Sequence, residues 1–323
     1  MPAPAYPSFP PPGMLRAPFS WFTDFQRAFP TRLPFLFKTR RQFLRAAGAS
    51  GIAAAALTAV DGAIFEPNFP IVVRQEIPLR RWPERLDGFT IAVLSDFHYD
   101  RYFSIHPLEA AIGMVNSLKP NLIALAGDFV SMPLVLGDDE HAASLAEPCS
   151  RLLARMNAAE GLWAVLGNHD FNTDAQRVTH ALEAQGITVL ANRSVAISRQ
   201  GERFWLAGVT DVLSRTADLE QTIRGIPENE AVVLLAHEPD YADKVARYPV
   251  DLQLSGHSHG GQVRLPLLPP LFLPDMAKKY FLGLYQIGSL TLYTNAGLGT
   301  VGLPVRLNCP PEITLITIRH LAR

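Results

Sequence analysis

Short apolar runs that alternate with amphipathic stretches dominate the sequence from about residue 70 onward. The apolar runs typical of buried strands lie at 90–94, 122–126 and 163–166. The stretches with a helical apolar period lie at 107–118, 142–156 and 174–185. Strands and helices in alternation predict an α/β domain.

The later part of the chain is richer in strands, which are joined by short links. The predicted strands there are 195–198, 204–208, 231–236, 252–255, 290–295 and 313–318. Gly201, followed by Glu202 and Arg203, indicates a hairpin, so part of a sheet is antiparallel. Many strands with few helices between them predict two mixed sheets packed face to face and flanked by helices.

Composition excludes several classes of protein. Apolar residues make up 48% of the chain and charged residues 18%, so wholesale disorder is excluded. The net charge of −1 gives no broad basic surface for nucleic acid, and we expect no nucleic-acid partner. Cys149 and Cys309 are too few for a disulfide scaffold or a cysteine-rich zinc site.

The first 65 residues differ from the rest and are expected to form a separate leader, with the folded domain at 66–323. Residues 1–38 are rich in Pro and Phe and show no helical or strand period. Thr39-Arg40-Arg41-Gln42-Phe43-Leu44-Arg45 follows, and 46–60 then carries no charge. This order predicts a twin-arginine export signal, a partnership with the export machinery and a periplasmic or cell-envelope location. A surface helix with a chance Arg-Arg pair is the plainer alternative.

The fate of the leader is left open by the sequence. The uncharged run is shorter than the roughly 20 residues that span a bilayer comfortably. No Ala-x-Ala cleavage site is evident before the folded part begins. Residues 46–65 therefore either remain as a membrane anchor or are removed.

Polar clusters come directly after the apolar runs, where the carboxyl ends of strands meet at one edge of a sheet. They are Ser95-Asp96-Phe97-His98, Gly127-Asp128, Gly167-Asn168-His169-Asp170, His237 and Gly256-His257-Ser258-His259-Gly260-Gly261. In an extended segment residues i and i+2 point the same way, so each Asp-x-His or His-x-His pair is expected to grip one ion. Imidazole, carboxylate and amide ligands suit Mn²⁺, Fe²⁺ or Zn²⁺ better than Ca²⁺. Taken singly, each cluster also fits a helix cap or a hydrogen-bonded structural histidine.

Taken together, the order of these clusters resembles the calcineurin-like metallophosphoesterase superfamily. The segments GHSHGGQVRLP and YTNAGLGTVGLPVRLNCPPEITL, with the arginine-led leader, resemble its exported or membrane-associated bacterial phosphodiesterase branch. The similarity covers residues 70–320 and implies a four-layer α/β/β/α sandwich. Many members carry a second acidic residue three positions after the Asp of Gly-Asp. Ser131 stands there in this chain and is expected to change only the support around the ligands.

The resemblance implies two divalent transition-metal ions (Mn, Fe or Zn) and a role for each polar residue. The first ion would be held by Asp96, His98 and His259. The second ion would be held by Asn168, His237 and His257. Asp128 would bridge both, and a hydroxide shared by the ions would attack phosphorus. His169 would bind no metal and would protonate the leaving group. Asp170 either orients His169 or caps the following helix.

Two further features bear on the substrate. Arg264 and Arg306 are candidates for contacts with phosphate oxygens, although a surface arginine is the plainer interpretation of each. Residues 265–274 (LPLLPPLFLP) form an apolar, proline-stiffened segment. It is either a cover over the core or a hydrophobic lip for an acyl chain or a membrane surface.

The leading hypothesis is a phosphodiesterase or pyrophosphatase that acts on an envelope lipid- or nucleotide-linked phosphate, with possible peripheral membrane contact. An exported phosphomonoesterase is the second interpretation. A non-catalytic scaffold on the same fold is the third, although a scaffold would tolerate loss of the ligand residues.

Overall fold

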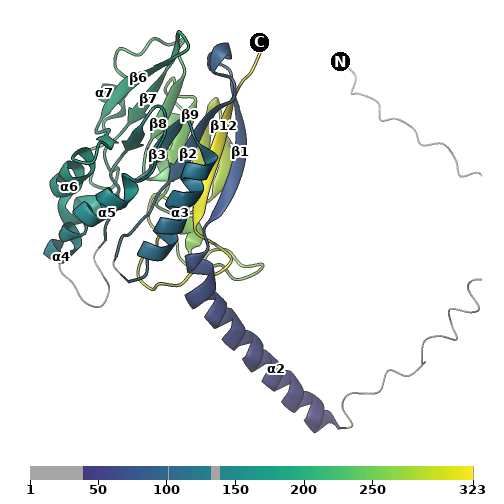
Figure 1. Cartoon of the computed structure of the whole chain (residues 1–323). Coiled ribbons are helices and arrows are strands. Elements are labelled where there is room, and N and C mark those ends of the chain that lie inside the picture. Colours follow the sequence, from purple (N-terminus) through teal and green to yellow (C-terminus); the bar gives the residue numbers. More distant parts are fainter. Residues whose placement is uncertain (1–38, 101, 132–138, 323) are drawn as a thin grey trace, which may run out of the picture. The chain divides into compact units, whose positions relative to one another are not determined.

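The computed structural model describes residues 39–100, 102–131 and 139–322 (Figure 1). The predicted leader segment 1–38 lies outside these residues. Contacts divide the chain into two units, Met1–Ala55 and Ala56–Arg323.

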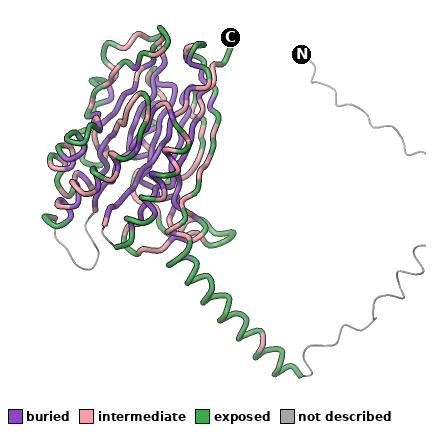
Figure 2. The backbone as a smooth tube through the Cα atoms, in the orientation of Figure 1, coloured by how far each residue is buried: buried purple, intermediate pink, exposed green. Residues whose placement is uncertain are grey.

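The paired arginines begin a long helix. Helix α2 spans Arg40–Val60 and has no buried residue, as Figure 2 shows by its exposure along its length. A π-helical turn, η1 (Asp61–Phe65), and a 3₁₀ turn, η2 (Glu66–Asn68), continue it. By length and composition alone, Arg40–Asn68 is the one helical segment in the described part of the chain that could cross a membrane. It is longer than the uncharged run because helical backbone extends past both ends of 46–60.

The larger unit contains two six-stranded mixed sheets. The order of the first sheet is β1 (Ile71–Leu79), β12 (Glu312–His320), β2 (Phe89–Leu94), β3 (Leu122–Leu125), β4 (Leu162–Ala164) and β5 (Thr188–Val189). The order of the second is β10 (Gly283–Ile287), β11 (Leu290–Thr294), β9 (Leu252–Ser255), β8 (Val232–Leu235), β7 (Glu202–Gly208) and β6 (Arg193–Arg199). Strands β2–β5 are parallel, as are β7, β8, β9 and β11. The predicted hairpin is β6–β7.

Helices cover the outer faces of both sheets. The helices are α3 (Ile105–Leu118), α4 (Asp139–Ser144), α5 (Ala146–Leu153), α6 (Asn168–Glu183), α7 (Leu219–Ile223) and α8 (Ala242–Val245). Single 3₁₀ turns are η3 (Glu84–Leu86), η4 (Pro239–Tyr241) and η5 (His259–Gly261).

Three apolar cores separate four layers, which confirms the predicted α/β/β/α sandwich. Along β2, Ala92 and Leu94 pack against α3, α5 and α6, whereas Ile91 and Val93 pack against the second sheet. The outer face of the second sheet packs against α7 and α8. Alternate residues of one strand thus enter two different cores, as the pleat requires, and the central strands are buried throughout (Figure 2).

Two predicted helices differ in the structure. The predicted helix 142–156 is broken at Leu145 into α4 and α5, because Pro148 has no N–H to continue the ladder from the preceding turn. The predicted helix 174–185 is the second part of α6. A first turn starts at Asn168, and Asp174 departs from helical backbone with φ −165° and ψ 89°.

The structure adds three strands that the sequence did not suggest, β1, β5 and β10. Each lies at an edge of its sheet. Edge strands are exposed on one side, so their residues mix polar and apolar types and lack the continuous apolar run of a central strand.

We expect the core between the sheets to be sensitive to lost volume. Phe204 is fully buried, and its ring centroid lies 4.6 Å from that of Trp82 and 5.2 Å from that of Phe89. Phe204→Ala should lower the free energy of unfolding by about 3–5 kcal/mol in chemical denaturation, and Phe204→Leu by less. Leu284→Ala, at a half-exposed edge position, should change it by no more than about 0.5 kcal/mol. Equal losses for Phe204→Ala and Leu284→Ala would contradict this packing.

Candidate metal centre

The predicted site residues converge at the carboxyl ends of parallel strands from both sheets. Asp96 and His98 follow β2, Asp128 follows β3, and Asn168 follows β4 in the first sheet. The second sheet contributes His237 after β8, and His257 and His259 after β9. The three strands of the first sheet are parallel to one another, and so are the two of the second (Figure 1).

One cluster contains Asp96, His98 and His259, whose ligand atoms lie within 4.8 Å of one another. The Nε2 atoms of His98 and His259 are 2.9 Å apart, and His259 Nε2 is 3.4 Å from Asp96 Oδ1. All three side chains are buried. The membership coincides with the set that the resemblance implied for the first ion.

A second cluster contains Asp128, His237 and His257, again with ligand atoms within 4.8 Å. Asp128 Oδ2 lies 3.1 Å from His237 Nε2 and 3.6 Å from His98 Nε2, so this carboxylate lies between the two clusters. That position is the one expected of a bridging ligand.

The side chains converge through left-handed backbone and not through the extended segments we expected. Asp96, His98, Asp128, His257 and His259 all have φ between 39° and 69°. Residues other than glycine occupy this region at a cost of roughly 1–3 kcal/mol each, and such strain concentrates at functional sites. The expectation that i and i+2 residues share a face of a strand is therefore wrong. Asp96 and His98 still lie in one cluster, whereas His257 and His259 lie in different clusters.

Buried polar atoms without hydrogen bonds show that the residues fit bound cations. Asn168 Oδ1 and His237 Nε2 are buried and make no hydrogen bond. His237 Nδ1 lies 2.6 Å from the Ala126 carbonyl oxygen, and His257 Nε2 lies 2.8 Å from that of Asp275. A carbonyl only accepts, so these two ring nitrogens carry the protons. The opposite ring nitrogens are therefore the atoms that would bind a metal.

Electrostatics favours the ligand forms of most of these groups. Burial lowers the pKa of His98 to about 3 and that of His257 to about 4, so both imidazoles are neutral. Burial likewise lowers the pKa of His259. Burial alone would raise the pKa of Asp128, but the charges of His237 and His169 bring it below its ordinary value, so Asp128 is a carboxylate. His237 is the exception among the histidines: burial alone would lower its pKa, but the Asp128 and Asp96 carboxylates raise it well above its ordinary value, and a bound cation would replace the extra proton. Neutral imidazole and ionised carboxylate are the forms that bind metal.

The Asp170 carboxylate holds the loops that carry these ligands. It accepts hydrogen bonds from the backbone N–H groups of Asp128, Phe129, Val130 and Gly167, at 2.9–3.2 Å. The bond from the Gly167 N–H caps the start of α6, because Gly167 is the N-cap residue and the Asp170 side chain reaches back to its backbone N–H. Of the two roles considered for Asp170, the structure shows the helix cap. The same carboxylate also binds the backbone of the loop after β3.

His169 lies at the cavity and shares a third cluster with His98 and Asp128. Its backbone N–H donates to Asp128 Oδ1 at 2.9 Å, and its ring meets the ring of His98 edge-on at 4.8 Å between centroids. Its side chain is half-buried, whereas those of His98 and His259 are buried.

The expectation for Arg306 does not hold. Arg306 is neither a surface arginine nor a phosphate ligand, because its guanidinium is fully buried and donates to the carbonyl oxygens of Gly299, Ala296 and Cys309. These hydrogen bonds stabilise the loop at 296–309, in which Gly297 packs against Asp96. Arg264 is half-buried, and its contact with substrate stays a prediction.

The centre opens into a cavity of about 540 Å³ that is lined by polar and by apolar residues, which we call its polar wall and its apolar wall. The polar wall is formed by Asp128, Asn168, His169, His257 and His259. The apolar wall is formed by Leu271, Phe272, Pro274, Val301, Leu303 and Val305. Residues 265–274 therefore include cavity-lining residues and do not simply cover the core.

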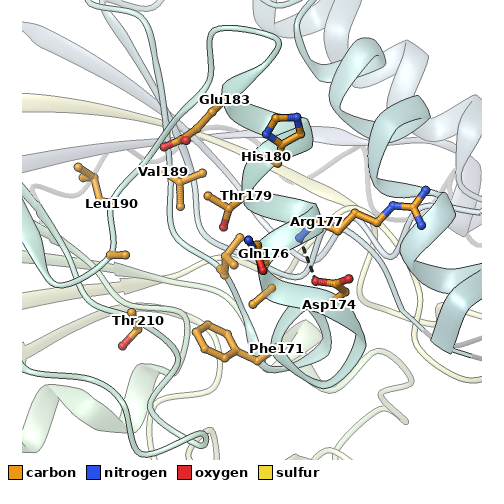
Figure 3. Close-up of a pocket in the computed structure, with 13 residues that line it drawn as sticks. Phe171, Asp174, Gln176, Arg177, Thr179, His180, Glu183, Val189, Leu190 and Thr210 are labelled. Atoms are coloured by element: carbon orange, nitrogen blue, oxygen red, sulfur yellow. Dashed lines mark hydrogen bonds between the residues drawn. The ribbon is translucent and has the colours of Figure 1, made fainter.

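A larger cavity of about 700 Å³ runs along α6 and contains none of the predicted site residues (Figure 3). Its charged residues have partners. Arg177 pairs with Glu147 at 3.0 Å, and Glu183 lies 3.7 Å from Arg193. The dashed line in Figure 3 is the cap from the backbone N–H of Arg177 to Asp174. We assign this cavity no role.

Comparison with known proteins agrees with this geometry. Residues 89–261 match the family model described as calcineurin-like phosphoesterase. The chain belongs to this phosphoesterase family. The family is dimetal-dependent, and this phosphoesterase is a metal-dependent phosphoester hydrolase.

Three relatives illustrate the range of the family. The "Uncharacterized metallophosphoesterase YkuE" of Bacillus subtilis is 37% identical, over 87% of this chain and 98% of that protein. "Phosphodiesterase YaeI" of Escherichia coli is 30% identical, over 87% and 99%. The "Transmembrane protein with metallophosphoesterase domain" of Danio rerio is 31% identical over 82% of this phosphoesterase, which spans 61% of that longer protein.

Several groups that shape the centre have no signature in the sequence. Ser95 Oγ donates to Asp96 Oδ2 at 2.5 Å, and the His257 N–H donates to the same carboxylate at 2.9 Å. The carbonyl oxygens of Ala126 and Asp275 orient two histidines, and any residue type supplies a carbonyl. Among these groups, Ser95 is the exception, because its position next to Asp96 in the sequence indicates that it can contact this carboxylate.

The close approach at Gly256 gives a prediction. A Cβ at this position would lie 2.5 Å from Ser95 Oγ and would also overlap the Asp96 carboxylate. Gly256→Ala should therefore reduce the metal content of the purified protein, measured by elemental mass spectrometry, by about half or more.

Gly113→Ala is the matched control. No atom lies within 4 Å of a Cβ there, and alanine favours helix α3 by roughly 0.5–1 kcal/mol. Full metal content in Gly256→Ala, or a loss in Gly113→Ala, would count against the described packing.

Proposed function

We propose that this phosphoesterase hydrolyses a phosphodiester or pyrophosphate bond of an envelope lipid- or nucleotide-linked molecule. The observation that carries the proposal is a pair of ligand clusters with Asp128 between them, next to a cavity that both polar and apolar residues line. A charged phosphate next to an apolar substituent matches these two walls. The name of the Escherichia coli relative, a phosphodiesterase, supports the same reaction class.

The assignment of residues follows the clusters. Asp96, His98 and His259 would hold one ion, Asn168, His237 and His257 the other, and Asp128 would lie between them. Two divalent ions, each Mn, Fe or Zn, would activate water and neutralise charge on the phosphoryl group. Asp96 and Asp128 are the only carboxylates in the proposed set, so the loaded site has a net positive charge that attracts an anionic phosphate.

His169 is the proposed general acid. It lines the cavity and is less buried than His98 and His259, so its ring can meet the departing oxygen. As an imidazolium it gives its proton to the leaving alkoxide while the P–O bond breaks. The backbone bond from His169 to Asp128 fixes its distance from the clusters.

The apolar wall distinguishes between the phosphodiesterase and the phosphomonoesterase interpretations. Leu271, Phe272 and Leu303 are each at least 65% exposed and so offer apolar surface that a phosphomonoester of a small alcohol would not cover. An ester with a long apolar substituent would bury this surface. We therefore favour a lipid-linked diester, and the test below includes both classes.

The location is part of the proposal. The paired arginines at the start of α2 support export by the twin-arginine machinery to the cell envelope. The apolar length of Arg40–Asn68 supports retention of this segment as an anchor. The printed name of the Danio rerio relative, a transmembrane protein, is consistent with membrane association.

The first test concerns His169. Because the residue is proposed to bind no metal, His169→Ala should keep both ions while losing about 10²–10⁴-fold in kcat on a dialkyl phosphate. The loss on bis(4-nitrophenyl) phosphate should be smaller, since that leaving group needs little protonation. Loss of one ion in His169→Ala, measured by elemental analysis, would overturn its assignment as the acid.

The second test concerns the reaction class. Protein purified without chelators should contain two transition-metal ions per chain and should hydrolyse members of a panel of diesters, monoesters, phospholipids and nucleotide-diphospho sugars. Asp128→Asn should lose metal and activity together, because this carboxylate lies at both clusters. A preference for monoesters would favour the phosphatase alternative, and no hydrolysis on the whole panel would favour a scaffold.

A further inference from the structure

The exposed apolar side chains of the larger unit are gathered on a few loops. After residue 60, all but three of the exposed large apolar side chains in the described segments lie within 64–71, 102–105 and 265–272 or at Leu303. The three exceptions are Leu213, Leu284 and Leu321. Soluble monomers rarely concentrate apolar surface in this way, and large patches mark surfaces that contact a partner or a membrane.

We name two parts of this surface. The rim consists of Leu265, Leu267, Leu268, Leu271, Phe272 and Leu303. The root consists of Ile64, Phe65 and Phe69, which follow α2 directly in the chain. Rim residues Leu271, Phe272 and Leu303 also line the cavity of the proposed metal centre.

Hydrogen bonds join the root to the rim. The backbone N–H of Arg306 donates to the Gly62 carbonyl at 2.9 Å. The N–H groups of Asn308 and Cys309 donate to the Glu66 carboxylate. Asn308 Nδ2 donates to the carbonyl of Arg264, one residue before the rim begins. Asn308 thus contacts both segments.

Hydrogen bonds also join the rim to Gln262, the residue that follows the predicted ligands His257 and His259. The side chain of Gln262 donates to the carbonyl oxygens of Val301 and Leu303 at 3.1 Å and accepts from the Val301 N–H. Gln262 follows the His257–Gly261 cluster directly. The mouth of the cavity, the rim and the root therefore form one connected surface.

A third group of exposed residues lies beside the segment that contains the root. Tyr102 and Phe103, 86% and 60% exposed, line a small depression together with Ala63, Pro67 and Pro304. Exposed apolar side chains therefore lie near the root at 102–103 as well as at the rim. An apolar surface at the point where an apolar helix joins the domain matches the plane of a bilayer that holds this helix.

We propose that this face docks on a lipid bilayer, so that the mouth of the cavity opens at the membrane surface. The apolar segment Arg40–Asn68 runs in the chain directly into the root. Leu267 supports the assignment, because its side chain is wholly exposed on a left-handed backbone (φ 65°). Both the left-handed backbone and the exposure of this side chain to water are unfavourable, whereas contact with lipid would remove the side chain from water.

The docking itself does not depend on catalysis, whereas its consequence for substrate access rests on the proposed function. A substrate held in the bilayer would reach the cavity laterally across the rim. A soluble substrate would enter from water without using the rim.

Fluorescence on the full chain tests the docking. Cys149 and Cys309 are free but buried, so an introduced surface cysteine can be labelled selectively with an environment-sensitive dye. Labels at Leu267→Cys and Leu303→Cys should shift to shorter wavelength in vesicles of phosphatidylethanolamine and phosphatidylglycerol (3:1) and should be quenched by spin-labelled lipid. A label at Leu284→Cys, on edge strand β10, should do neither. Rim labels that behave like the Leu284 label would overturn the proposal. So would a rim shift that grows with protein density and resists lipid quenching, since this would identify a second copy as the partner.

Kinetics tests the consequence for access. Leu267→Asp/Leu268→Asp changes two rim residues that do not line the cavity. Hydrolysis of hexadecyl 4-nitrophenyl phosphate in the same vesicles should fall at least tenfold, while hydrolysis of soluble ethyl 4-nitrophenyl phosphate stays unchanged. The matched control is Leu213→Asp/Leu284→Asp, which should affect neither. Equal losses on both esters would overturn lateral access. No hydrolysis of either ester by the wild-type chain would refute the proposed function, while the fluorescence result would still decide the docking.

Discussion

The buried carboxylate of Asp128 is the contact on which the centre depends. It lies 3.6 Å from a histidine that follows a strand of the first sheet and 3.1 Å from one that follows a strand of the second. Carboxylates and neutral imidazoles crowded together away from water are costly unless a cation joins them. Binding of cations to the folded chain alone would stabilise it, so the packing of the two sheets and the occupancy of the centre are linked.

Because the backbone of the proposed ligands is strained, the surrounding structure has to hold their loops in place. Five of the proposed ligands occupy left-handed backbone, and each would relax if its loop were free. The loops are not free. Asp170 accepts three backbone hydrogen bonds from the loop that carries Asp128, and the N–H groups of Phe97 and His98 both donate to the Asp128 carbonyl. Short strands buried on both faces provide the fixed ends that such loops need.

The predictions from sequence were most successful where a continuous apolar run is followed directly by polar residues. Buried central strands are continuous apolar runs, and residues of the polar clusters directly after them lie close together in the structure. The edge strands β1, β5 and β10 were missed because exposure on one side removes that signal. The role of Arg306 was missed because its partners are backbone carbonyls, which every residue type supplies. The helix break before Pro148 followed from proline chemistry and was available in the sequence.

The segment after α2 belongs to the folded domain, and this limits the two alternatives for the leader. Gly62 accepts a hydrogen bond from Arg306, and Glu66 accepts two from the loop at 308–309. The same loop region carries Val305 and Leu303 on the cavity wall. A cut after residue 66 would therefore remove both of these contacts and with them support for the mouth of the cavity. Whether the leader stays or is removed, the mature chain needs the residues from Gly62 onward, and the domain keeps its apolar root in either case.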